Sequence, residues 1–329
     1  MATAFGPGPK ITVEDYQTTA IKHRRELLTI PSRQLETSTK FMTMRYGIRY
    51  AETVGELSGD MQFGPYSETR IDSNDVVINP RTLYTYFGSV VKKFSPNKIY
   101  QSIFGSDITK GDALKKTDIT MAVLTYLSAQ LGANLNKVLF SAKRNDDGTE
   151  SKDLFNGFDT IAKKEMDATN LSEDKGNLKK IEAITKLNAV DQLKAFLWAA
   201  DDELLEKDNL LLFVPRQVFL NYCEDYQTTL GSLPYNQEYK KYFVDGFDNV
   251  TLVPLANKKA SPFIQLTTKN NMLVGQNLVG EEEQIEVARF EAFVLQFIST
   301  CFFGVEYESI AKERILFGTV DGEASIVGA

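Results

Sequence analysis

The side chains that most often carry catalysis are scarce in this sequence of 329 residues. His23 is the one histidine, and a Ser-His-Asp or Cys-His site would have to use it. It lies in the basic run Lys22-His-Arg-Arg25, with no glycine-flanked nucleophile nearby in sequence. We therefore expect His23 on a solvated helix face. The charges of Lys22, Arg24 and Arg25 either contact nucleic acid or a neighbour's carboxylates, or form an ordinary charged surface.

Metal and nucleotide motifs are missing from the sequence as well. Cys223 and Cys301 are far apart, and two lone cysteines with one histidine cannot close a tetrahedral zinc site. We expect both as reduced core residues of a cytosolic protein. No Gly-x-x-x-x-Gly-Lys-Ser/Thr or Gly-x-Ser-x-Gly pattern occurs. The run Asn145-Asp-Asp-Gly-Thr-Glu150 lacks the ligand register of an EF-hand and predicts a turn. We thus expect no catalytic residue, no metal and no cofactor.

Composition and charge describe an ordinary globular chain. Apolar residues make up 43% and charged residues 25% of the sequence, so disorder is not expected. The formal net charge of -7 favours solubility and argues against a dedicated nucleic-acid-binding surface. Residues 1–10 have no apolar core and predict no signal peptide. The most apolar stretch, 290–305, is too short and too polar for a good membrane span.

Residues 1–42 predict an N-terminal arm rather than a domain. Two Gly-Pro pairs open it, and a helical patch at 15–28 is cut off by Pro31. The segment has too few apolar positions to form a core of its own. It must therefore pack on the rest of its chain or on a neighbour.

Residues 43–95 predict a long, extended β-hairpin. Apolar side chains of 44–50 alternate onto one face of a first strand, while Arg45 and Arg49 fall on the other. A turn-rich middle leads to a return strand around 82–91. Such a hairpin is marginal alone in water, so it needs a partner surface on its own domain or on a neighbour. The residues that we expect to contact a neighbour are Lys22, Arg24, Arg25, Arg45, Tyr46, Arg49, Tyr50, Glu52, Glu56, Phe63, Tyr66 and Arg70.

The rest of the chain predicts a body of mixed helices and strands. Thr117-Asp118 can cap a helix of roughly 24 residues, about 36 Å long, that reaches residue 141. Helices and strands alternate through 156–280 and give an α+β domain. Residues 293–307 form one strand with two largely apolar faces, so we expect it to be covered on both sides. The small-residue-rich tail from 319 onward predicts a pliable end.

The run Leu154-Phe-Asn-Gly-Phe-Asp159 resembles the start of the axial domain in capsid proteins of the Hong Kong 97 type. The order of arm, hairpin, long helix, α+β domain and two-sided strand is also similar to that family, the major capsid proteins of tailed double-stranded DNA bacteriophages. The resemblance implies an α+β, Hong Kong 97-like capsid fold. Its parts would be an N-terminal arm (1–42), an extended β-hairpin or E-loop (43–95), a peripheral domain with a β-sheet (96–155 and 281–318) and a spine helix (117–141), an axial domain (156–280) and a C-terminal tail (319–329).

The resemblance implies a structural protein and not an enzyme. Such a subunit assembles through pentamers and hexamers into the icosahedral head shell, in the host cytoplasm, and remains in the virion. The implied partners are further copies of the chain and portal, scaffolding and auxiliary or decoration proteins. The shell would enclose phage double-stranded DNA without sequence-specific binding and without a membrane. If this chain is the mature form, no N-terminal scaffolding segment was removed.

Three other functions stay open. An encapsulin-like nanocompartment shell protein would share the architecture. An α+β hydrolase or transferase would need a site based on carboxylates or lysines, because histidine and cysteine chemistry is nearly excluded. A tail or baseplate protein is disfavoured by the long helix.

Overall fold

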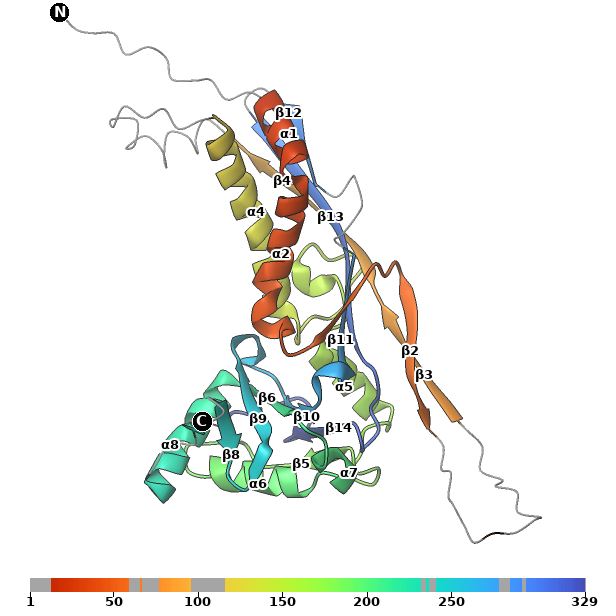
Figure 1. The fold of residues 1–329 in the computed structure, drawn as a ribbon, viewed down its shortest axis with the longest axis vertical. Helices are drawn as coiled ribbons and strands as arrows, with labels where there is room; N and C mark the ends of the chain where they lie inside the picture. The colour runs from red at the N-terminus through yellow and green to blue at the C-terminus, as the bar shows by residue number, and fades with distance from the viewer. Residues whose placement is uncertain are drawn as a thin grey trace, which may run out of the picture.

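The computed structural model describes residues 13–58, 66, 77–95, 116–231, 235–236, 241–277, 285–291 and 294–328. The strands in this part of the chain form a five-stranded sheet, a seven-stranded sheet and a two-stranded hairpin. The five-stranded sheet and its helices occupy one end of an elongated body, and the seven-stranded sheet occupies the other (Figure 1). The hairpin projects from the side of this body.

Three of the described helices cover one face of the five-stranded sheet. Their shared core with the sheet includes Tyr16, Leu124, Val287 and Phe297, all at most 1% exposed. The long helix that we expected at 117–141 is confirmed and ends at residue 138. The three helices are α1 (Val13–Lys22), α2 (Arg24–Thr39) and α4 (Lys116–Val138).

The described part of the expected arm folds onto its own chain. Helix α2 continues through Pro31, so the prediction that this proline ends the helix was wrong. A proline inside a helix costs about 3 kcal/mol, because it removes one N–H and crowds the preceding turn. That cost is offset here because Leu27, Ile30 and Leu35 are buried, and each such side chain contributes about 1.5–3 kcal/mol. From residue 13 onward, the arm does not depend on a neighbour for its core.

The five-stranded sheet is built around its longest strand, β13. This strand pairs antiparallel with β4 on one side and with β12 and then β11 on the other, and β1 pairs parallel with β11. We had placed 272–277 in the axial domain, but its pairing with β13 puts it in this sheet, which corrects that limit. The strands are β1 (Thr43–Tyr46), β4 (Tyr86–Phe94), β11 (Met272–Asn277), β12 (Ile285–Glu291) and β13 (Val294–Tyr307).

The seven-stranded sheet has the order β5-β14-β10-β6-β9-β8-β7. The last long strand of the chain, at 315–319, pairs with β10 and β5, although we had grouped it with the peripheral domain. Both corrections concern pairing between segments far apart in sequence, which local pattern does not specify. The strands are β5 (Leu178–Lys180), β6 (Leu210–Pro215), β7 (Tyr235–Asn236), β8 (Lys241–Val244), β9 (Phe247–Leu255), β10 (Phe263–Thr267) and β14 (Ile315–Thr319).

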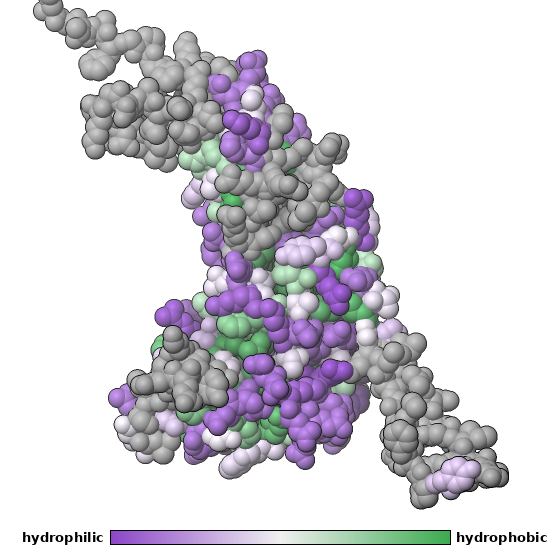
Figure 2. Space-filling model, viewed as in Figure 1, coloured by the Kyte–Doolittle hydropathy of each residue, from purple (hydrophilic) through white to green (hydrophobic). Residues whose placement is uncertain are grey.

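Four further α-helices and three short 3₁₀ turns occur in the described part of the chain. The surface at the end with the seven-stranded sheet is largely hydrophilic in the view of Figure 2, with small hydrophobic areas scattered between polar ones. The helices are α5 (Phe158–Asp167), α6 (Ala189–Trp198), α7 (Asp202–Leu205) and α8 (Arg216–Leu230). The turns are η2 (Ser151–Asp153), η3 (Ala256–Lys258) and η4 (Lys269–Asn271).

The C-terminal segment is hydrogen-bonded into the fold, so the prediction of a pliable tail was wrong. Ile326 is fully buried and donates its N–H to the carbonyl of Ser261. Ile184 donates to the carbonyl of Ile326 and accepts from the N–H of Gly328. A composition of small residues does not reveal this pairing, because the partners lie far earlier in the chain.

The hairpin consists of β2 (Ala51–Ser58) and β3 (Val77–Tyr84), paired antiparallel along eight residues each. The predicted continuous strand over 44–50 is broken after β1, where Gly47 has φ 81° and Tyr50 φ 69°. Glycine adopts this left-handed conformation without steric cost. The predicted return strand also divides, at Thr85, into β3 of the hairpin and β4 of the five-stranded sheet.

Candidate subunit-contact site

One face of the five-stranded sheet carries apolar side chains that its own chain leaves partly uncovered. On β13, Leu295 and Phe297 point toward the helices and are at most 3% exposed, whereas Ile298 on the opposite face is only half-buried. Val91 of β4 pairs with Ile298 on that second face and is 56% exposed. The expectation that 293–307 is covered on both sides was therefore wrong for this face. We call it the open sheet face; it comprises Phe87, Ser89, Val91, Ile298, Thr300 and Phe302.

An aromatic cluster lies where the open sheet face meets the foot of the hairpin, the end formed by residues 51–54 and 81–84. Tyr50 packs edge-on against Phe302 with ring centroids 5.2 Å apart, and Phe87 packs at 5.0 Å. Phe302 is 7% exposed, but Tyr50 and Phe87 are 68% and 54% exposed. Aromatic side chains gathered at an exposed apolar surface are typical of protein interfaces.

The foot of the hairpin lies directly on β11 and β13. A Cβ atom at Gly304 would fall 1.9 Å from the carbonyl oxygen of Tyr84, and one at Gly275 would fall 2.7 Å from the Thr85 methyl group. Only glycine allows so close an approach of two backbones. A small cluster of Ile48, Val54, Leu83 and Leu273 fills the remaining space.

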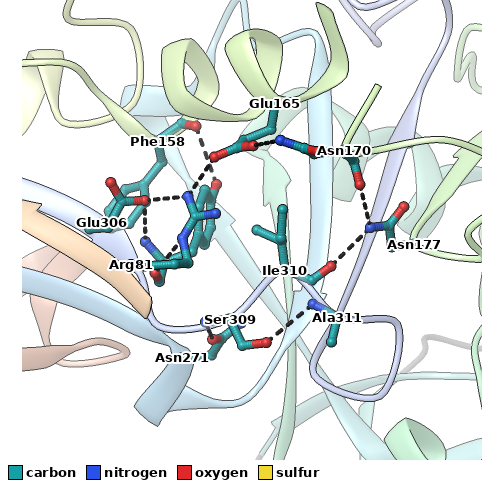
Figure 3. Close-up of polar contacts among 11 residues, drawn as sticks. Arg81, Phe158, Glu165, Asn170, Asn177, Asn271, Glu306, Ser309, Ile310 and Ala311 are labelled. Carbon is teal, nitrogen blue, oxygen red and sulfur yellow. Dashed lines mark hydrogen bonds and ion pairs between the residues drawn. The ribbon is translucent and has the colours of Figure 1, made fainter. Parts of the chain in front are cut away.

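Arg81 on β3 ties this foot to two other elements (Figure 3). Its Nη2 atom lies 2.7 Å from Glu306 Oε1 on β13 and 2.8 Å from Glu165 Oε1 on α5. Its Nε donates to the carbonyl of Tyr307 at 3.1 Å. The three charged side chains are only 13–19% exposed, so one guanidinium serves two largely buried carboxylates.

The charges in this cluster depend on each other. Burial raises the pKa of Glu306, and the charge and hydrogen bond of Arg81 offset part of that increase. Burial also opposes the charge on Arg81, but attraction to Glu306 and then Glu165 outweighs it, so the pKa of Arg81 is raised. Glu165 accepts a further hydrogen bond from Asn170, whose carbonyl accepts one from Asn177 (Figure 3). Asn177 also donates to the carbonyl of Ile310, in the loop that joins β13 to β14, so the hairpin is coupled to a connection between the two sheets.

The residues predicted as contacts are distributed unevenly over this site. Tyr50 touches the open sheet face through Phe302. Tyr46 is 58% exposed on β1, Tyr66 is 90% exposed, and Glu52 is half-buried on β2. Lys22, Arg45 and Arg49 are exposed. Arg24, Arg25 and Glu56 lie in α2 and β2 with side chains that the structure does not describe, and Phe63 and Arg70 lie outside the described residues.

The sequence did not single out Phe87, Val91, Phe302 or Arg81 as site residues. The alternation of Phe87, Ser89 and Val91 predicts a strand face, but it does not say whether that face is covered. Arg81 gave no signal at all, because its two carboxylates are 84 and 225 residues away.

The described residues offer little for catalysis. They contain no group of three His, Cys, Asp or Glu side chains placed to hold a metal ion. Burial raises the pKa of both thiols, Cys223 and Cys301, which makes them poorer nucleophiles. Lys258, fully buried, lies 3.2 Å from Asp159 and 2.8 Å from the Gln265 side-chain oxygen, and links η3, α5 and β10 rather than opening to a substrate. No helix in the described ranges is long and apolar enough to cross a membrane.

Comparison with known proteins identifies the fold. No family model and no curated protein sequence matches the chain. Among solved structures, a capsid chain of an empty GTA particle superposes with a TM-score of 0.55 at 12% identity, covering 87% of this chain and 89% of that one. A chain of the satellite phage P4 procapsid, which includes the size determination (Sid) protein, gives 0.55 at 8% identity, covering 88% and 89%. The chain thus has the α+β fold of phage capsid proteins, as its resemblance to the Hong Kong 97 type implied.

Proposed function

We propose that this chain is the major capsid protein of a tailed phage and assembles through hexamers and pentamers into an icosahedral shell around double-stranded DNA. The observation that carries the proposal is that one chain has both a projecting two-stranded hairpin and a partly uncovered apolar sheet face. The capsid fold supports it, since a fold of this kind is found in the shells to which the chain is similar. The protein is on this proposal structural and not an enzyme.

The hairpin of one copy would lie against the open sheet face of the next. A two-stranded ribbon needs a covering surface to be stable, and an apolar sheet face needs one to be dry. Burying Phe87 and Val91 fully would contribute up to about 1.5–3 kcal/mol each before the costs of association. Because each copy both gives and receives such a contact, the interface is head-to-tail, and an interface of this kind forms a ring where the rotation between copies closes.

The finer assignments follow from the same proposal. The body with the five-stranded sheet would be the peripheral domain with α4 as spine, and the body with the seven-stranded sheet would be the axial domain. Portal, scaffolding and decoration proteins would be the heterologous partners. The protein would assemble in the host cytoplasm and reside in the virion.

Negative-stain microscopy of the purified full chain, with light scattering, tests the proposal. We expect closed shells or rings from the wild type. We expect Phe87→Ser combined with Val91→Ser to remain unassembled with a wild-type far-UV spectrum, because the changes fall on the open sheet face. Tyr126→Ser is the control, since Tyr126 is also an exposed aromatic residue, at 63%, but lies on α4 and not on the open sheet face.

Three results would count against this reading. A wild-type chain that stays a 37.0 kDa monomer at high concentration would contradict assembly. Normal assembly by the double variant would contradict the role of the open sheet face, and the same loss in Tyr126→Ser would show that the effect is not specific to that face.

A further inference from the structure

A lysine-rich cleft of about 930 Å³ opens where the end of α4, helix α5, turn η3 and the C-terminal segment meet. Its lysines are Lys137, Lys143, Lys163, Lys164 and Lys259, which come from three separate stretches of the chain. A smaller cavity of about 410 Å³ shares Lys143 with it, but its two other cations, Arg144 and Lys152, are ion-paired with Asp146 and Glu150. In a chain with a net charge of -7, this is a local concentration of the opposite sign. We call the larger cavity the lysine cleft.

Most of these lysines are not neutralised by the protein. Within the described part of the chain, Lys137, Lys143, Lys164 and Lys259 form no ion pair, and all four are exposed. Lys163 pairs with Glu323 at 2.5 Å.

The carboxylates of the lysine cleft leave its positive charge largely in place. Asp159 forms an ion pair with the buried Lys258, which does not line the cleft, and Glu323 forms one with Lys163. Asp167 at the end of α5 is the remaining acidic side chain of the lining. Four uncommitted ammonium groups therefore face one uncommitted carboxylate.

The chemistry of the lining favours phosphate over a protein segment. Protein segments other than acidic motifs dock mainly through aromatic or branched aliphatic side chains in apolar pockets. The apolar members of this lining are small, namely Ala256, Ala260 and Pro262. The lining also has no aromatic side chain on which an unpaired base could stack, as single-stranded nucleic acid requires. Lysines on flexible stems suit sequence-independent contact with the phosphates of a duplex.

We infer that the lysine cleft binds backbone phosphates of double-stranded DNA and that its side of the subunit faces the interior of the shell. This inference rests on the proposed function. The cleft includes the C-terminal end of α4, which packs on the helix-covered face of the five-stranded sheet, whereas the open sheet face lies on the other side. A hairpin docked on the open sheet face would therefore leave the cleft free. Contacts of this kind hold packaged DNA weakly and without regard to sequence.

The experiment measures binding of unassembled full-length subunits to a fluorescent 30-base-pair duplex by anisotropy at several salt concentrations. The cleft variant changes Lys137, Lys143, Lys164 and Lys259 to glutamine. The control variant loses the same charge from four exposed lysines elsewhere: Lys175, Lys180, Lys186 and Lys269. We expect the cleft variant to bind about tenfold or more weakly at low salt and to have a slope of log affinity against log salt that is smaller by roughly 3–4, since each phosphate contact contributes about 0.9.

Three outcomes would overturn the inference. They are no duplex binding by the wild type at low salt, equal losses in the cleft and control variants, and cleft-dependent binding of a polyglutamate probe in place of DNA. Shell formation by all three proteins is scored separately by microscopy. A cleft variant that assembles normally but no longer binds DNA supports the inference. A wild type that binds DNA through the cleft yet never assembles would instead count against the proposed function alone.

Discussion

Replacing Arg81 with methionine would remove the charge that Glu306 and Glu165 share while keeping an unbranched side chain. Both carboxylates are less than a fifth exposed, so they would lose their partner where water barely reaches. Removing one partner of a buried ion pair typically costs about 3–5 kcal/mol. Because Glu165 keeps its hydrogen bond from Asn170, we expect the free energy of unfolding to fall by about 3 kcal/mol at neutral pH.

This loss should depend on pH in a defined direction. Burial already raises the pKa of Glu306, and without Arg81 it rises further, because Arg81 is what lowers it. Between that raised pKa and the ordinary glutamate value of 4.5, the folded variant binds a proton that the unfolded chain does not. Stability then increases as the pH falls through this window, since protonated Glu306 needs no counter-charge. The deficit of Arg81→Met relative to the wild type should be largest above the window and shrink within it.

Urea unfolding at pH 7.5 and pH 5.5, followed by far-UV circular dichroism, measures both effects. Adding Glu306→Gln to Arg81→Met should recover part of the loss at pH 7.5. Lys312→Gln is the control, because it breaks an ion pair with Asp201 at 2.7 Å whose lysine is 47% exposed and should cost far less. A deficit that is the same at both pH values, or no larger than that of Lys312→Gln, would refute the account of Arg81 as the partner of buried charge.

Two further changes test the hairpin foot and the C-terminal segment. Gly304→Ala would place a methyl group 1.9 Å from the Tyr84 carbonyl oxygen. We therefore expect the free energy of unfolding, measured by heat or urea, to fall by about 1–3 kcal/mol, against little change for Thr300→Ala. An unaltered Tm would contradict the close packing of β3 on β13. Ile326→Ala truncates a fully buried side chain and should cost about 2–5 kcal/mol. Ser325→Ala removes only the hydroxyl that accepts from the Val327 N–H and should cost less. Equal stability of the two variants would mean that the C-terminal segment is not part of the core.

Local pattern was sufficient to predict most helices and strands. The helix at 116–138 follows from apolar side chains that repeat at about 3.6 residues, and the strand at 210–215 follows from a short, continuous apolar run that Pro215 ends. Both signals are present in the segment itself. The predictions that were wrong concern segments whose partners are far away in sequence. Helix α2 continues through Pro31 because three of its side chains are buried against other elements. Strands β11 and β14 lie in a different sheet from the predicted one because of the strands with which they pair.

The candidate site shows the same limit more sharply. The apolar alternation of β13 is the same whether a face is covered by helices of its own chain or left for another copy. The sequence therefore identified the strand but predicted both faces as covered. Arg81 was missed because a single arginine in a polar stretch has no pattern, and its role exists only where β3, α5 and β13 meet.

The anchoring of the hairpin suggests how one sequence could serve two kinds of ring. Its foot is fixed by the backbone contact at Gly304, the small cluster with Leu83 and the charges around Arg81. Farther out, residues 55–58 and 77–80 are held by the ladder between β2 and β3, and a two-stranded ladder alone is marginally stable in water. Stability in the unassembled chain should therefore decrease from the foot outward. On the proposed function, a fixed foot sets the direction of the hairpin, while its outer part adjusts to neighbours that sit at different angles in pentamers and hexamers.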